Sequence, residues 1–164
     1  MEIIIQPPQT VLYILIGILV VIIASMLLKK GDRKKKMLSL VITVVVMAVV
    51  IFFVYRKGSI IVDDGGIRTN TFGKIEVSWD EIDKAEYIEA FDSTNYGLKS
   101  KLSGVGIGEL KAGLFLLKGG DRARIVVQKN EDALLLRAGD KLYLLAPDQL
   151  DSLVSEAAKY IDIE

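Results

Sequence analysis

The chain has 164 residues, and its 21 basic and 21 acidic residues give a formal net charge of +0. It contains neither cysteine nor histidine, which removes thiol nucleophiles, disulfides, structural zinc sites and the usual general base at neutral pH. An ordinary hydrolase site is therefore hard to build, and we expect a protein that is not an enzyme and uses no cofactor or metal.

Two long apolar stretches dominate the first third of the chain. Residues 11–28 and 37–55 contain no charged side chain. As helices they would be about 27–28 Å long, close to the roughly 30 Å hydrocarbon core of a bilayer. A cleaved signal peptide fits poorly, because Glu2 is the only charge in residues 1–10. Residues 1–57 therefore predict a transmembrane anchor of two helices.

The segment between these stretches, residues 29–36, is strongly basic. Its only acid is Asp32, and its basic residues are Lys29, Lys30, Arg33, Lys34, Lys35 and Lys36. Short basic loops stay on the cytoplasmic side of a membrane. We therefore expect a two-pass protein of the cytoplasmic membrane, with its basic loop inside and residues 58–164 outside the cytoplasm. Attraction of this loop to anionic lipid head groups is the alternative interpretation.

The two parts of the chain carry opposite charge. Residues 1–57 hold eight basic and two acidic residues, whereas residues 58–164 hold 13 basic and 19 acidic residues. An acidic domain disfavours nucleic acid as a partner, and it disfavours polyphosphorylated lipid as well.

From Gly58 onward the apolar residues alternate, which predicts strands separated by glycine-rich turns. The expected strands are 59–63, 66–71, 74–79, 84–90, 114–118, 124–128, 133–137 and 141–145. Residues 91–113 contain irregularly spaced glycines and predict a long loop, with a short strand inside it as the alternative. A final amphipathic helix is expected over residues 148–161, with Asp148 as its N-cap. The expected fold is a small barrel or sandwich of about seven strands, capped by this helix.

Residues 104–148, with the sequence GVGIGELKAGLFLLKGGDRARIVVQKNEDALLLRAGDKLYLLAPD, resemble the bacterial pleckstrin-homology-like (PH-like) domain family. The segment Ser78–Ile82 (SWDEI) is also similar to that family, and the likeness covers about residues 60–161. Many members are tethered to membranes by one or two apolar helices. The resemblance implies a split β-barrel with a capping helix, and a role in binding or assembly.

The resemblance brings no functional residue with it. Eukaryotic relatives that bind phosphoinositides use basic residues between the first two strands. Here that turn is Asp63-Asp64-Gly65-Gly66, which is acidic. The departure argues against head-group binding, while an exposed sheet edge or the long loop stays available to a peptide partner.

Three patterns could carry other chemistry, and each has a simpler explanation. The glycines of residues 104–108 lack the Gly-Lys-Ser/Thr ending of a P-loop, so a flexible loop is favoured. Ser100 or Ser103 with Lys101 would form a serine–lysine dyad only if the lysine were desolvated. The carboxylates Asp80, Glu81 and Asp83 could bind a cation, but they lack the pattern of an EF-hand loop and are expected in a solvated turn.

The candidate partner-contact residues are Tyr96, Lys99, Lys101 and Lys111, because these three lysines are the basic residues of the expected loop in an acidic domain. A solvated loop is the alternative. Trp79 is either an interface anchor or a residue that packs at the edge of the core.

These observations favour a membrane-anchored scaffold or protein-interaction module that is a subunit or regulator of a membrane assembly. Its partners would be the bilayer together with other proteins or further copies of itself. The alternative is a domain that senses a ligand or lipid and signals through the transmembrane hairpin.

Overall fold

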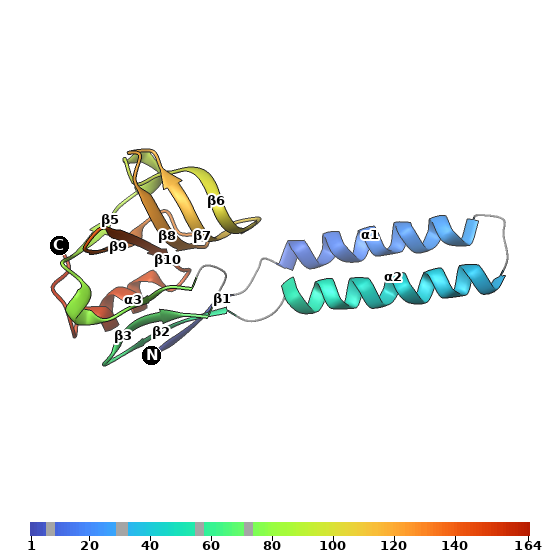
Figure 1. The fold of residues 1–164 in the computed structure, drawn as a ribbon, viewed down its shortest axis with the longest axis horizontal. Helices are drawn as coiled ribbons and strands as arrows, with labels where there is room; N and C mark the ends of the chain where they lie inside the picture. Colours follow the sequence, from blue (N-terminus) through green and yellow to red (C-terminus); the bar gives the residue numbers. More distant parts are fainter. Residues whose placement is uncertain (6–8, 29–32, 55–57, 71–73) are drawn as a thin grey trace. The chain divides into compact units, whose positions relative to one another are not determined.

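The computed structural model describes residues 1–5, 9–28, 33–54, 58–70 and 74–164 (Figure 1). It contains two compact units. One is a pair of helices, α1 (Gln9–Leu28) and α2 (Arg33–Val54). The other, which we call the β-domain, groups residues 1–5 with residues 58–164.

The helix pair matches two of the expected elements with one correction. We expected helices over 11–28 and 37–55; the second helix instead begins at Arg33, so residues 33–36 are helical rather than part of a loop. Lysine and arginine are good helix formers, which accounts for the earlier start. Lys29, Lys30 and Tyr55 lie outside the described residues. Over the side chains that are described, 12–25 in α1 and 34 and 37–52 in α2, no helix is long and apolar enough to cross a bilayer.

The first sheet of the β-domain has four strands in the order β1-β2-β3-β4. They are β1 (Glu2–Ile5), β2 (Gly58–Asp63), β3 (Gly66–Thr69) and β4 (Glu76–Val77), and each pairs antiparallel with the next.

The N-terminal residues belong to this sheet, although we expected them to form part of the anchor. Ile3 and Ile5 are each 1% exposed, while Glu2 and Ile4 are exposed, which is the period of two that a half-buried strand requires. Ile5 lies opposite Gly58 in the ladder. Both helices are therefore inserted between two neighbouring, paired strands.

The second sheet has six strands in the order β5-β9-β10-β8-β7-β6. In chain order they are β5 (Lys84–Ile88), β6 (Leu98–Ile107), β7 (Leu110–Leu117), β8 (Arg122–Val127), β9 (Ala133–Ala138) and β10 (Lys141–Ala146). The β8–β10 pair is parallel and the other pairs are antiparallel. Short 3₁₀ turns at Trp79–Glu81 and Phe91–Ser93 flank β5.

The prediction of a long loop over residues 91–113 is wrong. Residues 98–107 form β6, and β7 begins at Leu110, so most of this segment is a β-hairpin that turns at Gly108. The prediction failed because glycine, serine and lysine outnumber the β-branched and aromatic residues that normally identify a strand.

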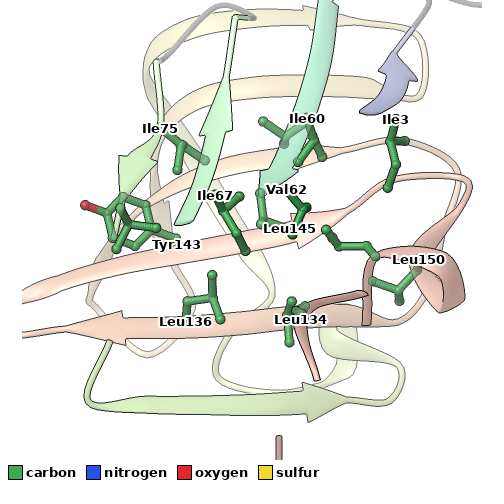
Figure 2. Packing of buried hydrophobic residues seen from close by; sticks show 14 of the residues in the cluster. Ile3, Ile60, Val62, Ile67, Ile75, Leu134, Leu136, Tyr143, Leu145 and Leu150 are labelled. Carbon is green, nitrogen blue, oxygen red and sulfur yellow. The ribbon is translucent and has the colours of Figure 1, made fainter. Parts of the chain in front are cut away.

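The central strands of the larger sheet are buried on both faces. One apolar cluster lies between the four-stranded sheet, strands β9 and β10, and the C-terminal helix (Figure 2); it includes Ile60, Ile67, Leu136 and Leu145. A second cluster contains side chains of alternate residues on the same strands, among them Leu135 and Leu144. This double burial explains the unbroken apolar runs ALLL and LYLLA, which are unusual for a sheet with one wet face.

The C-terminal helix, α3 (Leu150–Ala157), contributes to the first cluster as expected. Leu150, Leu153 and Ala157 are buried at helical spacing. The helix is shorter than the predicted 148–161, and Gln149 is its N-cap, with no side-chain capping bond. The carboxylate of Asp148 instead accepts the backbone N–H of Lys129 at 3.4 Å.

Candidate functional site

The β6–β7 hairpin, residues 98–117, contains three of the four predicted contact residues. Lys99 and Lys101 are exposed on β6, whereas Lys111 is half-buried on β7, opposite Gly106. Tyr96 precedes β6 and packs against the second apolar cluster. Lys99 and Lys101 therefore lie two residues apart on β6, whereas Lys111 lies on the neighbouring strand and Tyr96 precedes the hairpin.

The hairpin forms one edge of the larger sheet. Within the described part of the chain, β7 is the only strand beside β6. The ladder shifts register at Lys99 and again at Leu102, which makes each of them an extra residue in the strand. From Ser103 to Ile107 the pairing is regular, so this stretch presents an orderly row of outward backbone groups.

The opposite edge of the same sheet is partly covered by the end of the chain. The backbone N–H of Tyr87 donates to the carbonyl of Glu164 at 2.8 Å, and the N–H of Glu164 donates to the carbonyl of Ala85 at 3.0 Å. Lys84 also pairs with the carboxylates of Glu86 and Glu164, which hold the pKa of Lys84 above its usual range. An acidic residue, Glu164, thus occupies part of the edge at β5.

Charge is distributed unevenly over the β-domain. Strands β6 to β8, residues 98–127, carry six basic and two acidic residues, whereas residues 58–97 and 128–164 together carry seven basic and 17 acidic residues. The sequence prediction singled out the lysines at 99, 101 and 111 and missed Lys118, Arg122 and Arg124. These three residues join the same region because β8 pairs with β7. A count of charges over the consecutive expected strands would have indicated them in the sequence.

Lys111 lines a hollow of about 400 Å³ at one end of the β6–β7 hairpin. Lys129 also lines it, together with Asp92, Glu109 and Glu131, so the hollow has mixed charge rather than the uniform charge that would select an anion.

Asp132, close to this hollow in the sequence, binds both Tyr87 on β5 and Ala90, which follows β5. Its carboxylate accepts the Tyr87 hydroxyl and the Ala90 backbone N–H, each at 2.9 Å. The bond to Asp132, with burial, raises the pKa of Tyr87. Ala90 has φ 44°, a left-handed conformation that a residue with a side chain rarely adopts. The carboxylate therefore stabilises a strained backbone position at the rim.

Trp79 packs at the edge of the core, one of its two predicted roles. Its ring stacks on Tyr160 with centroids 5.0 Å apart and an interplanar angle of 7°. Its indole N–H donates to the carbonyl of Asp63 at 2.8 Å. Nearby, Lys84 and Tyr160 line a second hollow of about 430 Å³.

The carboxylates considered as cation ligands accept hydrogen bonds from the protein instead. Asp80 accepts the Ser78 hydroxyl at 2.8 Å, Glu81 accepts the Ser78 N–H at 3.2 Å, and Asp83 accepts the N–H of Gly139 at 2.6 Å. The Ser78 bond lowers the pKa of Asp80. Among the described residues, no cluster of three or more acidic side chains could hold a metal ion.

The other two chemical patterns belong to the hairpin. Residues 104–107 lie in β6 and Gly108 in its turn, so the glycines form part of a strand and not a phosphate loop. Ser100, Lys101 and Ser103 are all exposed on β6, so the desolvated lysine that a serine–lysine dyad needs is not found there.

The turn between β2 and β3 is acidic and internally paired. Asp63 binds Arg68, which lowers the pKa of Asp63. The carboxylate also accepts the N–H of Gly65 at 3.0 Å. Arg68 is therefore already paired with a carboxylate, and the turn itself carries no basic side chain that could bind an anionic head group.

Comparisons with known proteins agree with this architecture. The family model described as "Bacterial PH domain" matches residues 58–160, which is more than half of the chain. No curated protein and no solved structure gives a significant match. The match confirms the resemblance to this family, and its bounds agree with the expected coverage of about residues 60–161. The chain belongs to the bacterial PH domain family.

Proposed function

We propose that this protein is a membrane-anchored interaction module whose β-domain binds a protein partner through the β6–β7 hairpin. The observation that carries the proposal is the basic, solvent-facing β6 strand at the edge of an otherwise acidic domain. Membership of the PH domain family supports an interaction module, of either protein or lipid. The module would serve as a subunit or regulator of a larger membrane assembly.

The composition of the helices supports the anchor. The uncharged sequence runs from residue 11 to 28 and from 37 to 55, beyond the described side chains at both ends of the first stretch and at the C-terminal end of the second. Large apolar side chains are exposed along both helices, including Tyr13 at 67%, Val21 at 68% and Met37 at 71%. Exposed apolar surface of this extent is characteristic of a segment in contact with lipid or another protein.

The basic residues support the proposed orientation. The six basic residues of the connection lie between the two apolar stretches, and only two, Arg56 and Lys57, come immediately after the second. Those of the connection are Lys29, Lys30, Arg33, Lys34, Lys35 and Lys36. The excess of positive charge favours a cytoplasmic location for the connection between the helices. The β-domain would then lie outside the cytoplasm.

Site-specific photo-cross-linking in living cells tests the proposed contact surface. A photoreactive residue at Ser103, exposed on β6, should give a discrete cross-linked protein, whereas one at Lys141, exposed on β10, should not. Charge reversal at Lys99 and Lys101 should abolish the cross-link from Ser103. Cross-linking that is equal from both positions, or that survives the charge reversal, would contradict the proposed surface.

Deletion of residues 99–111 would test this surface less cleanly. In the structure that deletion removes nearly all of β6 and the adjoining turn, so the sheet itself would change. Point substitutions of exposed lysines leave the β6–β7 ladder intact.

A second candidate function is sensing of a ligand or lipid with signalling through the helices. The insertion of α1 and α2 between β1 and β2 favours it, because any movement of the helix pair is covalently connected to two paired strands. Saturable binding of a co-purifying lipid that changes with deletion of β1 would support this function. Absence of saturation with lipids extracted from the native membrane would contradict it.

A further inference from the structure

We propose that the outer edge of β6 receives an extended acidic segment of a partner protein, which adds to the larger sheet as a further strand. This inference rests on the proposed function and specifies its partner. Strand addition derives affinity from backbone hydrogen bonds and specificity from alternate side chains.

The edge has the length and exposure that such pairing needs. β6 has ten residues, and all of them are exposed or half-buried. The regular part, Ser103–Ile107, includes Gly106, whose missing side chain leaves room for a second backbone. Around Gly106 no atom lies within 4 Å of where a Cβ would be.

The two bulges restrict where a strand can add. An extra residue at Lys99 and another at Leu102 interrupt the ladder, and bulges of this kind discourage indiscriminate edge pairing. Backbone pairing is therefore confined to residues 103–107. Lys99 and Lys101 lie just beyond this stretch, with Leu102 47% exposed between Lys101 and Ser103. A segment that pairs with residues 103–107 and continues would meet two lysines and one apolar contact.

The other edge of the same sheet shows which chemistry suits this arrangement. There Glu164 pairs with β5 through two backbone hydrogen bonds, and its carboxylate binds Lys84 at 2.9 Å. An acidic residue paired with a strand that carries lysine is thus already present within the molecule.

Charge decides between an acidic partner and a second copy of this chain. Pairing of β6 with β6 of another copy would place the lysines of both strands at one interface, which is unfavourable. An acidic segment complements them, and it also complements the surplus of four positive charges over residues 98–127. The observations therefore favour an acidic segment from a different protein.

The test uses the full chain in a neutral detergent and a fluorescent eight-residue peptide of alternating glutamate and valine. Fluorescence anisotropy should show saturable binding that weakens with salt. Methylation of every backbone nitrogen of the peptide keeps its charge but removes its donors, and should weaken binding at least tenfold. A lysine–valine peptide should not bind.

Protein variants locate the site. The double variant Lys99→Glu with Lys101→Glu should weaken peptide binding at least tenfold. Lys141→Glu with Lys159→Glu, a matched pair of exposed lysines outside the hairpin, should change it less than twofold. Equal binding of the methylated peptide would overturn strand addition, and equal weakening by the two double variants would overturn the location.

Three further outcomes separate this inference from the proposed function. If Ser103 cross-links to a protein in cells but the peptide does not bind, strand addition fails and the interaction surface stands. If phosphatidylglycerol vesicles bind through Lys99 and Lys101 and the peptide does not, the edge recognises anionic lipid and the proposal is overturned. Loss of both the cross-link and peptide binding would contradict the proposed function as well.

Discussion

Gly104 on β6 and Gly113 on β7 lie directly opposite one another, and both have positive φ, 120° and 136°. A Cβ on Gly104 would collide with the carbonyl oxygen of Ala112, and one on Gly113 would collide with that of Ser103. The two strands approach each other through this glycine pair. It fixes the register of the hairpin that carries the proposed contact surface.

Gly104→Ala should destabilise the β-domain by about 1–3 kcal/mol, because it combines a disfavoured φ with a backbone collision. Urea unfolding followed by the fluorescence of Trp79, the single tryptophan, measures the change. Gly106→Ala is the matched control, since its Cβ meets no atom within 4 Å, and it should be close to neutral. Equal effects at the two positions would contradict the role assigned to the glycine pair.

The sheet position of β1 leads to a second prediction. Ile3→Ala should reduce the free energy of unfolding by about 2–5 kcal/mol, because this side chain is 1% exposed within the first apolar cluster. Ile4→Ala, one residue away and 50% exposed, should change it by less than about 0.5 kcal/mol. The same unfolding assay compares them. A larger loss for Ile4→Ala would mean that β1 pairs in another register.

The hydrogen bond from Tyr87 to Asp132 predicts a dependence on pH. A tyrosine whose folded-state pKa is raised contributes stability that is fully present below its unfolded pKa of about 10, and this is lost as pH rises through the folded-state value. Tyr87→Phe should therefore cost about 1–2 kcal/mol at pH 7, with the difference from wild type shrinking above about pH 10.

Urea unfolding at several pH values between 7 and 11 tests this difference. Lys84 also has a raised pKa and loses its contribution at alkaline pH, but it is present in both proteins, so the comparison isolates Tyr87. A difference that stays constant up to pH 11 would show that the hydroxyl is not bonded to a carboxylate.

The stack of Trp79 on Tyr160 has a direct optical test. Tyr160→Ala should shift the emission of Trp79 to longer wavelength, since removal of the neighbouring ring exposes the indole to water. Tyr160→Phe keeps the ring and should leave the spectrum nearly unchanged. An equal shift in both variants would assign the effect to the hydroxyl rather than to the stacked ring.

Local patterns in the sequence predicted much of the β-domain but not its two non-local features. The alternation of residues 59–63 and the helical spacing of residues 150–157 correspond to β2 and α3, because each depends on neighbours in the chain. β1 consists of only Glu2–Ile5 and becomes a strand through a partner more than fifty residues away. No local signal marks such a pairing.

The candidate site shows the same limitation. Lys99 and Lys101 were identified from charge alone, but their placement on an edge strand depends on β6 pairing with a β7 that the sequence predicted only from residue 114. The contributions of Arg122 and Arg124 depend on the next pairing along the sheet. Sequence charge therefore indicated the region, and the order of strands defined the surface.

Membrane topology is the measurement that tests the proposed anchor most directly. The chain has no cysteine, so Ser155→Cys on the exposed side of α3 and Asp32→Cys between the helices can be labelled singly. We expect a membrane-impermeant maleimide to label Ser155→Cys in intact cells and to reach Asp32→Cys only after permeabilisation. Labelling of Asp32→Cys but not Ser155→Cys in intact cells would place the β-domain in the cytoplasm and contradict the proposed orientation. Recovery of the chain in the soluble fraction after lysis would contradict the anchor itself.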